Sequence, residues 1–431
     1  MARERIRVGL MGLGVVGSGV ASILMEKADR IQAHIEYPVE LARVLVRDPG
    51  KKRQVQVPRE LLTTNSRDLL DDPAIDIIIE VMGGETPAYQ YIQEALKAGK
   101  HVVTANKEVM AKYGPELLTL ANQRGMDILY EASVGGGIPL IGPFQQDLAA
   151  NKITSIQAII NGTTNYILTR MAAEGAEFSE ALAEAQALGY AEPDPTNDVE
   201  GVDASYKLAV LATLAFHLPV RPRDVYCEGI TGLASRDFRY ARELGYAIKL
   251  LAIAREQNGM VEARVHPTLV PQSQLLAQIG GVYNAVCVQG DLVGTVVFYG
   301  PGAGSLPTSS AIVADLILLA KNITAGLTGR FRLREDWGKS ISPMSQVQTR
   351  YYLRMTVADH PGVLAQIASI LGHNQISIAS VIQKEADPQS QTAEIVIMTH
   401  MAREADMQDA LAKVRGLSVV QEIGGFLRAE G

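Results

Sequence analysis

The segment between Gly189 and Val210 carries the densest group of ionisable side chains in the sequence. Its five carboxylates fall within a dozen positions: Glu192, Asp194, Asp198, Glu200 and Asp203. Asp203 and Lys207 are four positions apart on a predicted helix and therefore share a face. An exposed pair of this kind stabilises a helix by only a few tenths of a kcal/mol. However, the helix continues as the almost wholly apolar YKLAVLATLAF. We therefore predict a buried lysine, whose pKa burial lowers toward the range useful for proton transfer.

Two further segments carry groups suited to ligand binding. In HVVTANKEVM a predicted strand ends at Thr104, which places Asn106 and Lys107 where open parallel sheets bind ligands. Taken alone, Lys107 is more simply interpreted as a surface lysine. In EASVGGGIPL three glycines lie between the carboxylate of Glu131 and an apolar turn. Such a loop exposes backbone carbonyl groups and could wrap a small hard cation, which prefers oxygen ligands.

A GxGxxG motif follows the first predicted strand and begins a predicted helix. It consists of Gly12, Leu13, Gly14, Val15, Val16 and Gly17. In this context the first glycine permits a tight turn, the second lets the backbone approach a pyrophosphate, and the third lets helix and strand pack closely. The phosphates would bind the free N–H groups at the positive end of the helix. The alternative is a glycine-rich turn without a ligand.

The residues after the second strand bear on the form of the dinucleotide. An acidic residue there binds the ribose 2′-hydroxyl of NAD, whereas an arginine accommodates the 2′-phosphate of NADP. Val39–Val46 is followed by Arg47 and Asp48, and then by the basic run Lys51–Arg53. Arg47 and the lysines suit a phosphate, and Asp48 suits a hydroxyl. We expect NADP to be preferred over NAD, with a merely solvated charge run as the alternative.

Apolar periodicity predicts the elements that position these groups. The first third alternates short apolar strands with helices, which is typical of a parallel sheet covered on both faces. Its predicted elements are strands Ile6–Leu10, Val39–Val46, Ile75–Val81 and His101–Thr104 and helices Val15–Leu24 and Tyr89–Ala98. The next part mixes long helices and strands, which suggests an α+β domain. Its predicted elements are strands Ile153–Ile160, Val261–Leu269 and Val293–Tyr299 and helices Phe178–Leu188 and Val202–Phe216.

A further helix should run from Ser309 to about Lys321, N-capped by Thr308 or Ser309, and pack back on the first domain. The last eighty or so residues predict the order βαββαβ of a ferredoxin-like sandwich. The fold class is therefore α/β, with a Rossmann-type doubly wound domain, an α+β domain and a ferredoxin-like domain. The predicted limits are 1–144, 145–308, the returning helix 309–327, a linker 328–349 and the last domain 350–431.

Composition agrees with several soluble domains. At roughly 150 residues per domain, 431 residues favour about three. A formal charge of −7 argues against a nucleic-acid or anionic-membrane partner. Cys227 and Cys287 form no CxxC pair, so a reducing compartment is expected. The basic and apolar N-terminus resembles a signal peptide in outline, but its glycines suit a cofactor loop, and no apolar run approaches the ~20 residues of a membrane span. We expect a cytoplasmic protein.

Taken together, these motifs resemble homoserine dehydrogenase along the whole chain. The resemblance rests on GLGVVG, TANKE, EASVGGGIP, GYAEPDPTNDVEGVDASYK, the late GPGAGSLPT and a C-terminal segment similar to an ACT domain, all in the family's order. It implies NAD(P)-dependent interconversion of L-homoserine and L-aspartate 4-semialdehyde, in the biosynthesis of threonine, methionine and isoleucine. It also implies a homodimer or homotetramer.

The resemblance also implies roles for particular residues. The catalytic group would be Lys207 as general acid/base, Lys107 as second active-site lysine and Asp198 as a further acidic residue. Glu192 and Asp203 would hold the amino group of the substrate, with Gly189 near its backbone. The dinucleotide would be bound by the GxGxxG loop, Arg47, Thr104, Lys107 and Gly304. A monovalent cation, sodium or potassium, would be bound by Glu131, Val134, Gly136 and Ile138.

In the segment DHPGVLAQIASIL a turn at Pro361–Gly362 precedes an amphipathic helix, whose N-terminus could receive the carboxylate of an amino acid. The resemblance implies threonine as an inhibitory effector; the alternative is a domain that only dimerises or does not respond.

Two other functions fit the sequence less well. Aspartate-semialdehyde dehydrogenase needs a nucleophilic cysteine, but Cys227 and Cys287 lack a nearby histidine and fall in apparently buried strands or turns. A non-catalytic sensor of dinucleotide and amino acid would have no reason to keep both lysines and the carboxylates together.

Overall fold

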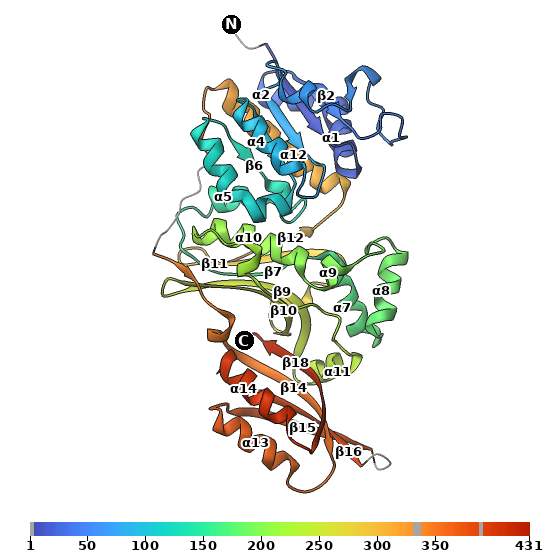
Figure 1. Cartoon of the computed structure of the whole chain (residues 1–431), viewed down its shortest axis with the longest axis vertical. Coiled ribbons are helices and arrows are strands. Elements are labelled where there is room, and N and C mark those ends of the chain that lie inside the picture. Colours follow the sequence, from blue (N-terminus) through green and yellow to red (C-terminus); the bar gives the residue numbers. More distant parts are fainter. Residues whose placement is uncertain (1–3, 331–337, 388–390) are drawn as a thin grey trace. The chain divides into compact units, whose positions relative to one another are not determined.

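The computed structural model describes residues 4–330, 338–387 and 391–431, which form two compact units. The first unit comprises Met1–Thr154, Tyr206–Asp224 and Val288–Lys339. The second comprises Ser155–Ser205, Val225–Cys287 and Ser340–Gly431. Figure 1 shows the elements in the order of the chain.

The first unit is built on a six-stranded parallel sheet of order β3-β2-β1-β4-β5-β6. Its strands are β1 (Ile6–Met11), β2 (Val39–Leu45), β3 (Leu62–Thr63), β4 (Ile77–Glu80), β5 (His101–Thr104) and β6 (Ile128–Leu129). Its first helices are α1 (Val15–Glu26), α2 (Ala28–Ile35), α3 (Arg67–Leu70), α4 (Ala88–Lys97), α5 (Lys107–Gln123) and α6 (Ile141–Gln145). This is the order of a doubly wound dinucleotide fold, whose ligands bind outside the carboxyl ends of the strands. The prediction for the first third is confirmed.

Helix α12 (Ser305–Thr324) packs against α1 in the first unit, as expected of the returning helix (Figure 1). It begins four residues before the predicted Ser309, and its N-cap is Gly304. The prediction was wrong because Pro307 was taken as part of a turn, although proline is tolerated in the first turn, where its missing N–H breaks no intrahelical bond. The hydroxyls of Ser305 and Ser309 donate to the carbonyls of Val15 and Val16.

By length and composition alone, α12 is also apolar enough to cross a membrane, contrary to our expectation that no run approaches that length. Its apolar side chains belong to the first unit's core, beside strands β1, β2 and β4 and helices α1 and α2. The helix is therefore apolar because it is a core helix, with 61% of its most apolar window buried.

The second unit contains an extended mixed sheet. Within it the strand order is β7-β9-β10-β18-β14-β16-β15. The strands are β7 (Ile153–Ile159), β9 (Tyr246–Gln257), β10 (Met260–Pro271), β14 (Gln348–Ala358), β15 (Ile378–Asp387), β16 (Thr392–Thr399) and β18 (Val420–Ala429). The helices α7 (Gly162–Glu174), α8 (Phe178–Ala187), α9 (Thr196–Val199) and α11 (Ser235–Glu243) complete its first part. Helix α10 (Val202–Phe216) and strand β11 (Tyr283–Gly290) continue into the first unit, which also holds β12 (Gly294–Pro301).

The C-terminal module, defined here as residues 348–431, confirms the predicted βαββαβ order. Its sheet order β18-β14-β16-β15 is that of a ferredoxin-like sandwich, and helices α13 (Val363–His373) and α14 (Glu404–Arg415) share one core with it (Figure 1). Strand β18 also pairs in parallel with β10, so that the module's sheet continues into the rest of the unit.

Three short strands pair with β10 and β14 outside this order. Strands β8 (Tyr226–Cys227) and β13 (Ser340–Ile341) pair with β10, and β17 (Ala402–Arg403) pairs with β14. Strand β13 lies within the predicted linker 328–349; residues 331–337 of that linker lie outside the described residues.

Candidate active site

The glycine loop between β1 and α1 has the geometry that the motif predicts. Gly12 has φ +106°, a conformation that favours glycine. A Cβ on Gly17 would lie 2.1 Å from the carbonyl oxygen of Gly12, so the third glycine lets the helix pack on the loop. A Cβ on Gly14 would meet nothing within 4 Å, which leaves the backbone at the N-cap of α1 open to a ligand. No acidic residue lies in the first turn of α1 to oppose an anion.

The loop after β2 is attached to the glycine loop by Arg53. Its guanidinium donates to the carbonyls of Leu13 at 3.1 Å, Lys51 at 2.8 Å and Asp48 at 2.8 Å. Interpreting Lys51–Arg53 as a simple charge run is therefore wrong for Arg53, which organises the loop. Arg47, the residue predicted to bind a 2′-phosphate, is exposed at the end of the second strand.

The carboxyl ends of β4 and β5 are joined by a buried acid that sequence reasoning missed. The hydroxyl of Thr104 donates to Glu80 at 2.7 Å, and the N–H of Met82 donates to the other carboxylate oxygen at 2.8 Å. Burial raises the pKa of Glu80. Asn106 caps α5 by accepting from the N–H of Val109 and donates its amide to the carbonyl of Gly84. Lys107 therefore lies just past the carboxyl end of β5, as predicted, and it is the first residue of α5, a helix that was not predicted from the sequence.

Helix α5 contacts the part of α10 that belongs to the same unit. The ammonium of Lys112 lies 5.7 Å from the ring centroid of Tyr206 and donates to Glu85 and Glu108, both at 2.7 Å. Tyr206 immediately precedes Lys207. The two predicted catalytic lysines therefore lie on helices of the first unit that contact each other. Lys207 itself is only partly buried, which corrects the prediction of a buried lysine, although most of the apolar residues after it are buried.

In the second unit, two of the predicted carboxylates converge on one amide. The side chain of Asn161 donates to Asp198 Oδ1 at 2.7 Å and to Asp203 Oδ2 at 2.9 Å. Asn161 and Asp203 are 5% and 4% exposed, so the amide offsets much of the cost of burying charge. The oxygen of the same amide caps α7 by accepting from the N–H of Thr164.

Sequence reasoning also missed Asn161. The available signal was NGTTN directly after an apolar strand, because asparagine at that position is a strong N-cap. The remaining predicted groups lie on the loop after α8. Gly189 has φ +77°, and Glu192 is exposed. In the described part of the chain the carboxylate of Glu192 has no hydrogen bond or ion pair, so the structure does not bring it to Asn161.

In the triple-glycine loop, Glu131 is bound to backbone amides. Its carboxylate accepts from the N–H groups of Leu140 at 2.5 Å, Ile141 at 2.8 Å and Gly142 at 2.7 Å, at the start of α6. Gly136 has φ +61°, and a Cβ there would lie 2.6 Å from the backbone of Gly302. The other predicted cation ligands, Val134 and Ile138, are buried beside it.

Among the described residues, no group of three or more histidine, cysteine or acidic side chains could hold a metal ion. A cation in the triple-glycine loop would therefore depend on backbone oxygens.

Neither cysteine suits covalent catalysis. Cys227 lies in β8, but its side chain is exposed rather than buried as expected. Its thiol donates to the carbonyl of Glu200 at 3.2 Å. Partial burial of the thiol, with the nearby carboxylates of Glu200 and Glu228, raises its pKa to about 11. Burial also raises the pKa of Cys287. Because the thiolate is the nucleophile, an acyl-enzyme mechanism is disfavoured.

Comparison with known proteins identifies the family. Residues 12–131 match the model described as "Homoserine dehydrogenase, NAD binding domain", and residues 139–317 match that of "Homoserine dehydrogenase". The chain is 43% identical to homoserine dehydrogenase of Bacillus subtilis over 428 residues, which cover 99% of both chains. It is 45% identical to that of Synechocystis, covering 98% of this chain and 99% of the relative. This chain belongs to the homoserine dehydrogenase family. It is therefore an NAD(P)-dependent oxidoreductase, and a non-catalytic sensor is not supported.

Solved structures agree with the homoserine dehydrogenase fold. A homoserine dehydrogenase from Thiobacillus denitrificans has a TM-score of 0.92 and 42% identity, covering 100% of this chain and 99% of that one. A hyperthermophilic archaeal homoserine dehydrogenase in complex with NADPH has a TM-score of 0.63 and 25% identity, covering 77% of this chain and 100% of that one. Residues 351–418 match the ACT domain model, so the prediction for the C-terminal module is confirmed.

Proposed function

We propose that Asp203, Asp198 and Glu192 recognise the cationic amino group of homoserine, with Gly189 near the substrate backbone. The observation that supports this most is the convergence of Asp198 and Asp203 on the amide of Asn161. Two carboxylates held together in this way favour a cation by charge-assisted hydrogen bonds.

Absorbance of reduced nicotinamide after adding homoserine and NADP tests both the reaction and this role. Asp203→Asn should raise KM for homoserine at least tenfold and leave KM for NADP unchanged. An unchanged KM for homoserine would remove Asp203 from the substrate site.

Lys207 is the proposed general acid/base, and Lys107 the second cation of the site. When bound, the cofactor supplies hydride to the carbonyl carbon of the aldehyde, or accepts it from homoserine. Reduction creates an alkoxide that needs one proton. The ammonium of Lys207 donates that proton, and the ammonium of Lys107 stabilises the negative charge. Oxidation of homoserine follows the same steps in reverse, with neutral Lys207 accepting the hydroxyl proton.

The dinucleotide is proposed to be NADP rather than NAD, bound by the GxGxxG loop, Arg47, Thr104, Lys107 and Gly304. The open backbone at Gly14 and the exposed guanidinium of Arg47 support this assignment. The buried hydroxyl of Thr104 already donates to Glu80, so Thr104 would contribute its backbone. Steady-state kinetics with NADPH and NADH at one pH test the preference; a strong preference for NADH would exclude it.

A sodium or potassium ion is proposed in the loop of Glu131, Val134, Gly136 and Ile138. The loop suits a hard cation through its backbone carbonyl oxygens, while the carboxylate of Glu131, which is held by three backbone N–H groups, adds negative charge beside them. Such an ion would order the loop, and no step of the reaction passes through it. Thermal unfolding in potassium, sodium and tetramethylammonium chloride tests this. The melting temperature should be higher with the small cations in wild type, and Gly136→Ala should abolish the difference. Equal melting temperatures in all three salts would argue against the site.

The C-terminal module is proposed to bind an amino-acid effector, with threonine the first candidate. A pocket of about 380 Å³ lies there, lined by residues that include Asp359, Pro361, Gly362 and Gln383. Gly362, with φ +94°, is the N-cap of α13, whose N-terminus can receive a carboxylate. L-threonine should raise the melting temperature and reduce activity, whereas D-threonine should do neither. No response to L-threonine would dismiss this effector.

The location, oligomeric state and pathway of the enzyme are proposed as well. We propose a cytoplasmic homodimer or homotetramer that acts in threonine, methionine and isoleucine biosynthesis, with the domain limits predicted from the sequence. Size-exclusion chromatography with light scattering tests the oligomeric state, and a monomer at micromolar concentration would contradict it.

A further inference from the structure

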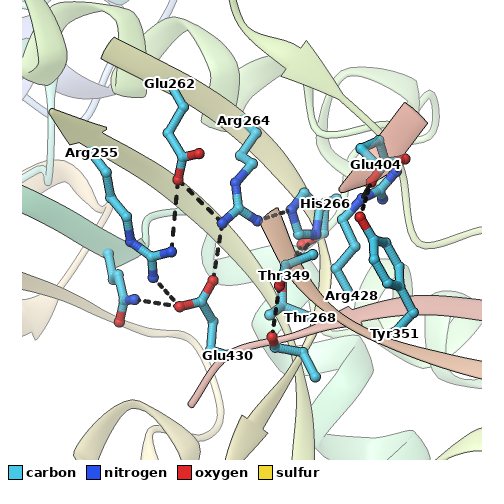
Figure 2. A network of polar contacts seen from close by, with 12 residues as sticks. Arg255, Glu262, Arg264, His266, Thr268, Thr349, Tyr351, Glu404, Arg428 and Glu430 are labelled. Carbon is cyan, nitrogen blue, oxygen red and sulfur yellow. Dashed lines mark hydrogen bonds and ion pairs between the residues drawn. The ribbon is translucent and has the colours of Figure 1, made fainter. Parts of the chain in front are cut away.

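A buried network of charges lies where β18 of the C-terminal module meets the strands of the second unit (Figure 2). Arg428 of β18 and Glu430, which directly follows the end of that strand, contact different partners. Arg428 is fully buried and donates to Glu404 of α14 at 2.6 and 2.8 Å, and to Glu228 at 2.7 Å. Glu430 instead contacts β9 and β10. The end of β18 and the residue after it thus connect helix α14 of the module to strands β9 and β10.

Glu430 is held by three donors. Its carboxylate accepts from Arg255 of β9 and from Arg264 of β10, the latter at 3.1 Å, and both pairs are drawn in Figure 2. Its third donor is the amide of Gln157 on β7, at 2.8 Å. Burial alone would raise the pKa of Glu430, but the two arginines lower it, so the group is an anion in the folded protein.

Gln157 connects this network to the carboxylates of Asp198 and Asp203. It lies on β7, opposite Ile253 of β9, and four residues later the same chain reaches Asn161. Asn161 has little freedom of its own, because its oxygen caps α7 and its amide holds Asp198 and Asp203. A shift of β7 would therefore move the amide relative to both carboxylates.

We propose that Gln157, anchored by Glu430, is a positioning residue for the substrate carboxylates. Glu430, directly after the last strand of the C-terminal module, thereby holds the end of β7 in place. The end of β7 in turn determines the position of Asn161 and the geometry of the Asp198–Asp203 pair. This inference rests on the proposed role of those carboxylates in binding homoserine. It assigns Gln157 no contact with substrate.

The test uses the full-length protein with Gln157→Met, which keeps the length of the side chain and removes only its hydrogen bond to Glu430. KM for homoserine should rise about threefold to tenfold, because only part of the free energy of the lost hydrogen bond is transmitted to the substrate carboxylates. The values of kcat and KM for NADP should stay at wild type, and the melting temperature should fall only by the few degrees that one lost hydrogen bond costs. Gln278→Met is the matched control, because Gln278 donates to the carbonyl of Gln272 in the same unit, away from Glu430. It should change none of these quantities.

Two further variants separate positioning from a purely structural role. Glu430→Gln should raise KM for homoserine by more than Gln157→Met and also lower the melting temperature, since it removes the nearer of the two carboxylates, Glu430 and Glu262, that face both arginines. In an Asp203→Asn background, Gln157→Met should raise KM by less than it does in the wild type, because one of the two carboxylates that it positions is gone.

A wild-type KM for Gln157→Met overturns the inference while leaving the proposed function intact, provided Asp203→Asn still raises KM. Equal rises in KM for homoserine and NADP, or full additivity with Asp203→Asn, also overturn it. An unchanged KM for Asp203→Asn overturns both proposals.

Discussion

The amide of Asn161 donates to Asp203 at 2.9 Å although the two residues are 42 positions apart. The same nitrogen donates to Asp198, and both contacts lie within the second unit. The pair is therefore held together by a neutral donor that serves both anions at once.

Asn161→Asp should lower kcat/KM for homoserine at least tenfold. The new carboxylate still accepts the cap from Thr164, but it removes the shared donor and adds a third negative charge beside Asp198 and Asp203. Steady-state kinetics at pH 7 measure this. Asn65→Asp is the control, because it adds a charge beside Asp68 at an exposed site. An unchanged kcat/KM for Asn161→Asp would show that the amide is dispensable.

Lys207→Ala should reduce kcat at least a hundredfold and change KM by much less. A group that donates a proton in the transition state contributes to turnover rather than to uniform binding. Lys97→Ala, an exposed lysine on α4, should leave both constants unchanged. If Lys207→Ala keeps near wild-type kcat while Lys107→Ala does not, the proton donor is Lys107.

The two glycines of the cofactor loop should respond differently to alanine. Gly14→Ala has space for its Cβ, so the melting temperature should not change, but the methyl group should raise KM for NADPH at least tenfold. Gly17→Ala would place its Cβ against the Gly12 carbonyl and should destabilise the fold by about 1–3 kcal/mol. Thermal unfolding without cofactor separates the effects. Equal melting temperatures for the two variants would contradict this division of roles.

Substitutions of Arg47 and Arg53 should change the KM values for NADPH and NADH in different ways. Arg47→Ala should raise KM for NADPH and not for NADH, since it removes only a partner of the 2′-phosphate. Arg53→Ala should raise both, because its guanidinium anchors the glycine loop through the carbonyl of Leu13. A selective loss of NADPH in Arg53→Ala would transfer the phosphate-binding role to that residue.

His266 should make the protein less stable in mild acid. Its ring is fully buried and takes a hydrogen bond from Arg264, and burial lowers its pKa well below the usual value. The folded state therefore binds fewer protons than the unfolded state below about pH 6.5, so the free energy of unfolding falls with falling pH by up to about 1.4 kcal/mol per unit.

Urea unfolding between pH 5 and pH 8 measures this slope. His266→Gln should reduce the slope between pH 5 and 6.5, where the raised pKa values of the buried acids Glu80 and Asp315 act in the opposite direction, whereas His34→Gln, at an exposed position, should keep it. The lowered pKa values of Glu404 and Glu430 add a separate loss only below about pH 4.3, where those groups protonate in the unfolded state. An identical slope in His266→Gln would assign the acid sensitivity to other groups.

Much of the fold could be predicted from local patterns. The bounds of β5 and α10 match the predictions, because an apolar run marks the extent of each element. Strand β9 was missed, since its run YAIKLLAIAREQ does not distinguish a buried strand from a buried helix by periodicity. The N-terminus of α12 was misplaced because Pro307 marks a turn and a first helical turn equally well.

The site could be predicted only where a single segment carries its chemistry. The glycine loop and the Asp203–Lys207 spacing belong to that class. Asn161, Glu80 and Arg53 do not, because each acts on groups that are distant in sequence: Asp203, Thr104 and Leu13. A lone asparagine, a buried glutamate or one arginine of a basic run gives no local sign of its partner.

The parallel pairing of Thr268 with Arg428 has a consequence for biosynthesis. The dinucleotide sheet can assemble once residue 129 has left the ribosome, but β10 waits for a neighbour about 160 positions further along. During that interval Arg264 has no Glu430 beside it. The part of β10 that later pairs with β18 is then open to pairing with other chains. Translation rate and chaperone supply should therefore limit the yield of this protein more through its second half than through its first.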